Sequence, residues 1–181
     1  TLLSFLFLNS QTQNIFIDSL HNEAFYQLHN DLDKSKEINQ KALDLSAKQN
    51  YSEGICESKR IDALILKEKG KYLEAYQKLT GALECKKKFK SNHEIWEIGA
   101  DFVALEGKIG RYDVAISKGF EIVEEASAAK DHYILSKTYN NISNAYDNLD
   151  DIDQALKFSL LSVEEAKKSE DELLLLISKH N

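Results

Sequence analysis

The chain has 181 residues, of which 43% are hydrophobic and 29% are charged, and its formal net charge is −7. This composition can supply a folded core and contains no apolar run long enough to cross a bilayer. The acidic balance argues against a nucleic-acid surface, which needs a concentrated positive face to displace phosphate counterions. With no proline and only seven glycines, the chain is predicted to be helical nearly throughout.

The first residues form a short apolar run, Leu2 to Leu8, followed by a polar stretch from Asn9 to Asn14. Three interpretations of residues 1–14 remain open: the remnant of a secretory signal, an amphipathic helix that caps the first repeat, and an unrelated tail. A signal remnant would make the protein exported or envelope-associated, and otherwise we expect it to be cytoplasmic. Residues 15–181 are predicted to form a single domain.

From there on, the same turn recurs every forty residues, at Asn30, Gly70, Gly110 and Asp150. Two residues after each turn comes a large apolar residue, and three after that a small one. The pairs are Leu32/Ser35, Tyr72/Ala75, Tyr112/Ala115 and Ile152/Ala155. A period without insertions is typical of a stacked-repeat solenoid, in which each repeat buries its apolar face against its neighbours.

Between the turns the apolar spacing is helical, so each of the four repeats predicts an antiparallel helix pair. The first helices are expected at 16–29, 53–69, 92–109 and 132–149, and the second helices at 32–48, 72–89, 112–129 and 152–169. Ser91, Asp131 and Asp171 are expected to cap helix N-termini. The basic run at 86–90 falls at a helix C-terminus, where we expect solvated lysines that complement the helix dipole.

The two cysteines fall at the same height on neighbouring helices of the second repeat. Cys56 lies 14 residues before Gly70 and Cys85 lies 15 after it. Helix axes pack about 8–10 Å apart, whereas a disulfide needs Cα atoms closer than about 7 Å. Two separate buried thiols are therefore favoured, and a disulfide stays open as the alternative if the protein is exported.

The fourth repeat carries Tyr139, Ile142, Ser143 and Tyr146 on its first helix, at the spacing that tetratricopeptide repeats use. The second and third repeats match mainly around the turn, through Gly70, Tyr72, Ala75 and Gly110, Tyr112, Ala115. Over about residues 16–169 the chain thus resembles a tetratricopeptide-repeat protein. The resemblance implies an all-α fold, a right-handed superhelical solenoid of antiparallel helix pairs whose first helices line a concave groove.

The repeat departs from the common pattern of about 34 residues by being six longer and lacking proline. Both helices of each pair are therefore expected to be longer by nearly a turn. Forty-residue variants of this kind look like those of bacterial sensory and regulatory proteins, which implies a scaffold that binds a protein or peptide segment.

When the first helices are aligned with the tetratricopeptide pattern, the resemblance implies that a set of their residues faces or borders the groove. The set is Arg60, Leu64, Lys137, Asn140, Asn141, Asn144, Asp147 and Asn148. Asparagine is a mediocre helix former, so its clustering between 140 and 148 carries a local cost. An amide both donates and accepts and so suits a peptide backbone, while Lys137 or Arg60 suits an acidic side chain or C-terminal carboxylate. A merely solvated polar face is the alternative.

The last segment, Leu173 to Ile177, is apolar all round and is predicted to begin a fifth helix pair. Such a helix needs cover, either from further repeats or from self-association. The five histidines show no metal-binding spacing, and no glycine-rich phosphate loop follows a strand. We therefore expect no enzyme, metal or cofactor, and predict a binding scaffold, with a structural module that stacks through its apolar end helices as the alternative.

Overall fold

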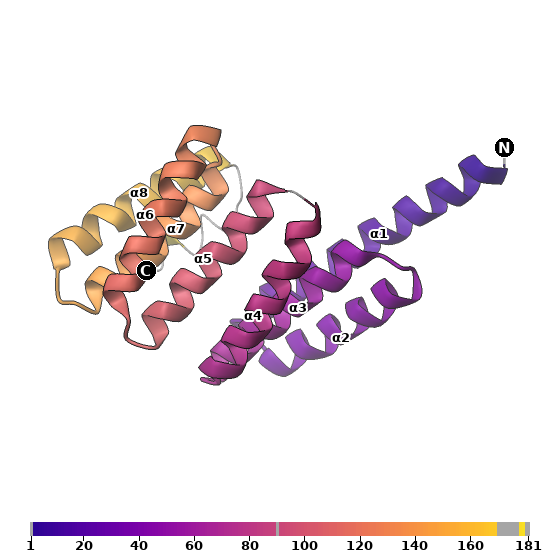
Figure 1. Cartoon of the computed structure of the whole chain (residues 1–181), viewed down its shortest axis with the longest axis horizontal. Coiled ribbons are helices and arrows are strands. Elements are labelled where there is room, and N and C mark those ends of the chain that lie inside the picture. The colour runs from indigo at the N-terminus through magenta and orange to yellow at the C-terminus, as the bar shows by residue number, and fades with distance from the viewer. Residues whose placement is uncertain (1, 90, 170–177, 180–181) are drawn as a thin grey trace. The chain divides into compact units, whose positions relative to one another are not determined.

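A computed structural model describes residues 2–89, 91–169 and 178–179 of the chain. Within these ranges the structure consists of α-helices and one short 3₁₀ helix, and no strand occurs (Figure 1). The helices are α1 Leu2–Gln27, α2 Leu32–Lys48, α3 Ser52–Glu68, α4 Tyr72–Lys86, α5 Asn92–Lys108, α6 Tyr112–Ala129, α7 His132–Asp147 and α8 Ile152–Ser169. The all-α prediction is therefore confirmed for the described residues.

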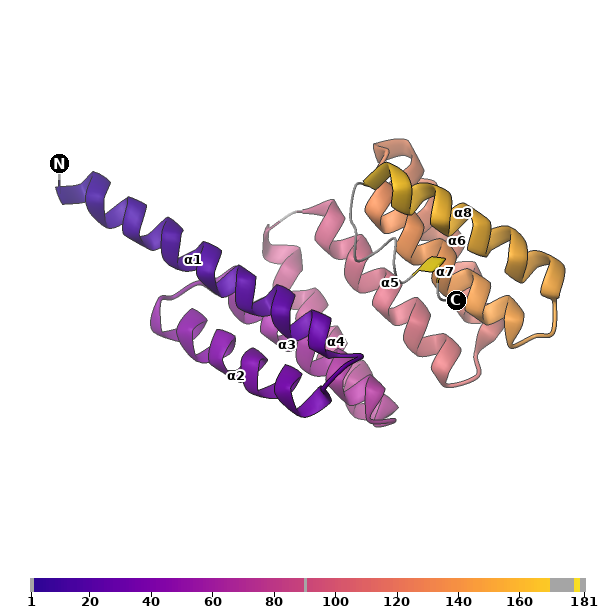
Figure 2. The same cartoon turned by 180° about the vertical axis from the view of Figure 1, so that it is seen from behind.

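The helices fall into two compact units, each of which is described by itself. The N-terminal unit covers residues 1–90 and contains α1 to α4, and the C-terminal unit covers residues 91–181 and contains α5 to α8 (Figure 2). Helices α2, α6 and α8 occupy the predicted ranges. Helix α4 ends at Lys86 and continues as the 3₁₀ helix Lys87–Phe89, while α1 begins at Leu2, well before the predicted start at 16.

The turn that recurs in the sequence has the same backbone geometry in three of the four repeats. Gly70, Gly110 and Asp150 adopt positive φ angles of 71°, 81° and 59°. The N–H of the residue after each of them donates a hydrogen bond to the carbonyl five positions earlier. The Lys71 N–H, for example, donates to the Leu66 carbonyl at 2.9 Å. This closure ends a helix through a left-handed residue, and glycine adopts that conformation without a Cβ penalty.

Two of the three predicted N-caps are confirmed. The Ser91 side chain accepts a hydrogen bond from the Glu94 N–H at the start of α5, and Asp131 accepts one from the Ile134 N–H at the start of α7. Asp171 lies outside the described residues. These caps satisfy N–H groups that have no partner within the helix, and they set where α5 and α7 begin.

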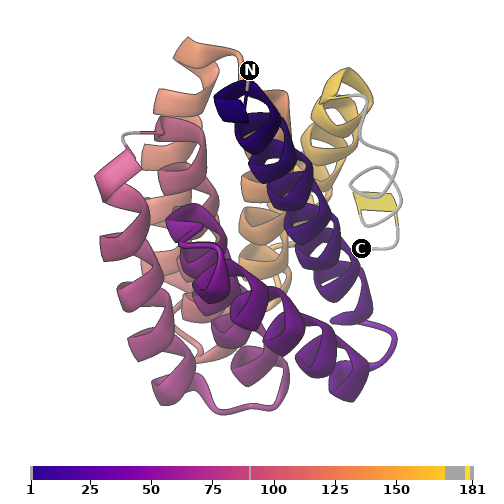
Figure 3. The same cartoon turned by 90° about the vertical axis from the view of Figure 1, so that its right-hand side faces the viewer.

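In the N-terminal unit, α1 packs along α2 and α3 along α4, while α2 and α1 both lie against α3 (Figure 3). The core contains Ala24, Leu28, Ile61, Leu64 and Ile65. The small residue after each turn is buried, as predicted, in all four repeats. Ser35 illustrates why: its hydroxyl donates to the Ala24 carbonyl at 2.7 Å, which holds α1 and α2 at close approach.

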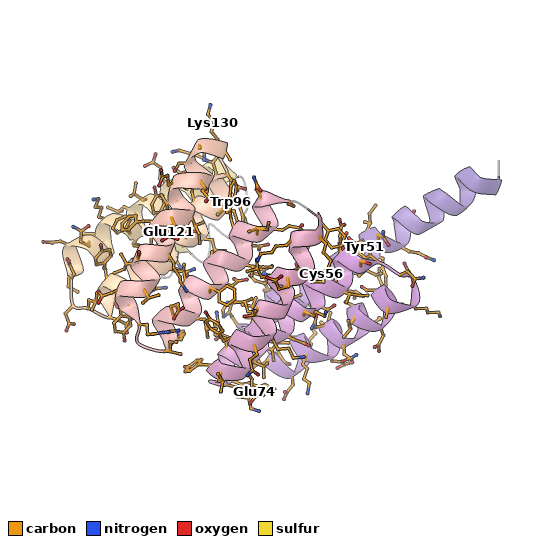
Figure 4. The ribbon with its side chains drawn as sticks, viewed as in Figure 1. Tyr51, Cys56, Glu74, Trp96, Glu121 and Lys130 are labelled. Atoms are coloured by element: carbon orange, nitrogen blue, oxygen red, sulfur yellow. A yellow bond between two sulfur atoms is a disulfide. The ribbon has the colours of Figure 1, made fainter. Side chains whose placement is uncertain are left out.

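Cys56 on α3 and Cys85 on α4 form a disulfide, so the expectation of two separate thiols is corrected (Figure 4). Their Cα atoms are 5.5 Å apart. The expectation compared the spacing of helix axes with a limit that applies to Cα atoms. Each Cα lies about 2.3 Å from its helix axis, so Cα atoms on the facing sides of two helices are much closer together than the axes, which are about 8–10 Å apart. Residues at equal height on facing sides of a helix pair therefore fall within bridging distance.

In the C-terminal unit, α5 pairs with α6 and α7 with α8, and α7 also lies against both α6 and α5. One tight contact fixes the approach of α6 to α7. A Cβ built on Gly119 would lie 2.6 Å from Ile142 Cγ1, so only a glycine fits without a shift. None of the helices in the described residues is both long and apolar enough to cross a membrane.

Candidate binding site

The first helices α5 and α7 lie side by side and share a charged contact. Lys137 Nζ on α7 lies 2.7 Å from Asp101 Oδ1 and 3.5 Å from Glu97 Oε1 on α5. The three side chains are largely buried, so these ion pairs are less screened than surface pairs. The predicted site residue Lys137 thus has its charge compensated within the chain.

Two further hydrogen bonds extend this contact along both helices. The Tyr133 hydroxyl donates to Glu97 Oε1 at 3.1 Å, and the Asn141 amide donates to the Ala100 carbonyl at 2.8 Å. We call the surface formed by Glu97, Asp101, Tyr133, Lys137 and Asn141 the α5–α7 polar face. It holds the two first helices in a fixed register.

The remaining predicted residues of α7 continue from this face toward the C-terminal end of the helix. Asn148 caps that end, because its amide donates to the Asn144 carbonyl at 2.7 Å. Asn140 is half-buried, whereas the side chains of Asn144 and Asp147 are exposed. The asparagine cluster therefore divides by role, with Asn141 joining helices, Asn148 ending one, and Asn144 directed to solvent.

Arg60 and Leu64 belong to the N-terminal unit, and its own side chains cover both. Leu64 is 4% exposed and packs in the core, so almost none of its side chain is accessible to a ligand. Arg60 is 3% exposed, and its guanidinium pairs with Glu57 at 2.7 Å and lies 5.7 Å from the centre of the Phe25 ring. Both residues serve the packing of this unit.

Glu57 is the centre of a buried charge cluster that the sequence did not reveal. Besides Arg60, it pairs with Lys86 Nζ at 3.3 Å. Burial opposes ionisation of Glu57, but the positive charges of Arg60 and Lys86 outweigh it and hold its pKa below the usual range. Lys86 is buried, so the expectation of a solvated lysine is wrong at this position, although Lys87 and Lys88 are exposed.

His21 borders this cluster from α1, where its Nε2 lies 2.8 Å from the Ser58 hydroxyl. Burial lowers its pKa below 6.5, while Glu57 and Asp18 partly counteract this effect. The folded N-terminal unit therefore favours the neutral imidazole.

Glu97, Asp101 and Tyr133 are the members of the α5–α7 polar face that sequence reasoning missed. The signal was present in one pair, because Glu97 and Lys137, which are in contact, are forty residues apart in the sequence. Stacked repeats bring equivalent positions of successive first helices side by side. Pairs of complementary residues at that spacing therefore identify contacts between repeats.

The described residues contain no group of three or more histidine, cysteine, aspartate or glutamate side chains that could hold a metal ion. The apolar segment Leu173 to Ile177, which was expected to be covered by further repeats or by self-association, lies outside the described residues. No protein-family model matches the chain, and no curated protein matches it either.

Proposed function

We propose that the chain is a non-enzymatic interaction module of the tetratricopeptide type, a right-handed superhelical solenoid that binds a protein or peptide segment on its first helices. The observation that carries the proposal is the packing of first helix on first helix, α1 against α3 and α5 against α7, within each unit. The forty-residue length of the repeat, which resembles that of variants in bacterial sensory and regulatory proteins, supports such a protein as the setting.

The polar contacts on α7 indicate how a segment would be held. Because Glu97 and Asp101 compensate Lys137, recognition relies on amide hydrogen bonds more than on the lysine charge. Asn144 offers an exposed amide one helical turn beyond the α5–α7 polar face. The amide can donate to a carbonyl and accept from an N–H of an extended peptide backbone, so this contact does not depend on the sequence of the peptide.

Selection of a random peptide library on the immobilised full chain tests the proposal, with affinities of the selected peptides measured by fluorescence anisotropy. Asn144→Ala is expected to weaken these peptides about three- to tenfold, the effect of one lost hydrogen bond. Gln77→Ala, which removes an exposed amide from the second helix α4, is the matched control and should leave binding unchanged. A selection that yields no binder, or binders that tolerate Asn144→Ala fully, would count against this site.

A further inference from the structure

The last turn of α7 carries a negative charge at a place where helices favour a positive one. Asp147 is exposed, and within the described part of the chain it forms no ion pair. The negative end of the helix dipole lies at the same place, so this carboxylate adds charge of the same sign. Helices α2 to α5 and α8 each have a lysine in their last turn, whereas α7 has no basic residue there. The end of α7 is therefore electrostatically unfavourable in the chain alone.

This carboxylate lies beside the amide for which we propose peptide binding. Asn144 and Asp147 are three residues apart on α7, so their side chains are neighbours on the helix surface, and both are exposed.

The preceding repeat shows that this position stays open when another repeat follows. The equivalent of Asp147, forty residues earlier, is Gly107 on α5. A Cβ added to Gly107 would have nothing within 4 Å, although α7 packs beside α5. By this comparison, the position of Asp147 is not one that the next helix of the chain covers, and it is accessible to a partner.

The acidic charge of the chain is concentrated in the unit that contains α7. Residues 91–181 include 18 acidic and 9 basic side chains and so carry a formal charge of −9. Residues 1–90 include 12 acidic and 14 basic side chains and carry +2. A field of this sign attracts a cationic partner and speeds its association.

We propose that the segment bound at Asn144 is basic, and that one of its lysine or arginine side chains pairs with Asp147 at the C-terminal end of α7. The inference rests on the proposed function, because it names the chemistry of the partner at the same site. The Asn144 amide holds the peptide backbone, while Asp147 and the negative end of the helix dipole select the positive side chain.

Peptides selected from a random library on the immobilised full chain, at about 0.15 M salt, test the charge of the partner. They should contain more lysine and arginine than the unselected library. Asp147→Asn should weaken their affinity about two- to fivefold in fluorescence anisotropy, the effect of one exposed ion pair. Glu121→Gln, which removes an exposed negative charge from the second helix α6, is the matched control and should leave their affinity unchanged.

Reversal of the charge tests the pairing itself. Asp147→Lys should weaken the basic peptides about tenfold or more, and should restore binding of peptides in which the pairing residue is replaced by glutamate. A lysine at this position complements the helix dipole, so the melting temperature should not fall. Weaker binding by this variant is then not a result of unfolding.

The outcomes separate this inference from the proposed function. Peptides that respond to Asn144→Ala but show no excess of basic residues would overturn the inference and leave the proposed function standing. A selection that yields no binder would overturn both. Equal weakening by Asp147→Asn and Glu121→Gln would show that only the overall charge attracts the peptides, and would overturn the pairing with Asp147.

Discussion

The disulfide between Cys56 and Cys85 should dominate the stability of the N-terminal unit. It joins α3 to α4 across a sequence separation of 29 residues. In the chain-entropy description, a loop of this length restricts the unfolded chain by about 3–4 kcal/mol at room temperature. The double substitution Cys56→Ala and Cys85→Ala removes this restriction without placing a hydroxyl group in the core.

The expected fall in melting temperature depends on how the chain unfolds. If the N-terminal unit unfolds alone, as a domain of about 90 residues, a loss of 3–4 kcal/mol lowers its melting temperature by about 20 °C. If all 181 residues unfold together, the fall is about 10 °C, because the same free energy is divided by a larger unfolding entropy. The size of the shift therefore also reports the cooperativity between the units.

Differential scanning calorimetry of the double variant measures this shift, and the wild-type chain with a phosphine reductant is the control for the substitutions themselves. Both samples should melt at the same lowered temperature. A shift below about 3 °C in both would refute the entropic reasoning. Two titratable thiols per chain in denaturant, without reductant, would show that the bridge does not form.

Three further outcomes follow from packing and charge. Gly119→Ala should destabilise the C-terminal unit by about 1–3 kcal/mol, because the added Cβ would overlap a buried isoleucine. Gly81→Ala in α4 should instead stabilise the N-terminal unit by about 0.5–1 kcal/mol, because nothing lies within 4 Å of the added Cβ and alanine is the better helix former. Urea midpoints of the two variants that move in the same direction would contradict this. Burial lowers the pKa of His21 below 6.5, so the unfolding free energy should fall as the pH drops below 6.5, and His21→Asn should reduce that slope in urea titrations at successive pH values. Burial opposes ionisation of Glu165, but hydrogen bonds from Lys168 and His132 outweigh this effect and hold the pKa of Glu165 below 4.5. The stability that this carboxylate contributes is therefore present above pH 4.5 and is lost as the pH falls below it. The melting temperature of Glu165→Gln should accordingly change less on acidification than that of the wild type.

The forty-residue period was enough to predict the helix pairs, because each signal in it acts locally. A left-handed turn residue such as Gly70 ends a helix wherever it stands. The alternation of apolar and polar residues sets which face of the following helix is buried, and a small residue such as Ala75 permits close approach. These effects depend on neighbours a few positions away, so they can be read without knowing the fold.

The candidate site was predicted less well, because its members depend on distances between helices. Lys137 and Asn141 were named from the sequence, but their partners on α5 appear only once α5 and α7 are placed side by side. Leu64 occupies a position that the alignment assigned to the groove, and in the structure it fills the core instead. Local signals indicate which face of a helix is buried, but they do not identify the helix that covers it.

The sequence by itself determined that this protein is helical, where its helices begin and end to within a few residues except for the start of α1, and which small residues lie between paired helices. Only the tertiary structure decided that Cys56 and Cys85 are joined, that Lys86 is buried beside Glu57, and that Lys137 is paired with Asp101. The physical reason is range. Helix formation and termination are governed within about five residues, whereas disulfides, buried ion pairs and exposed faces depend on segments that the chain brings together over 29 residues or more.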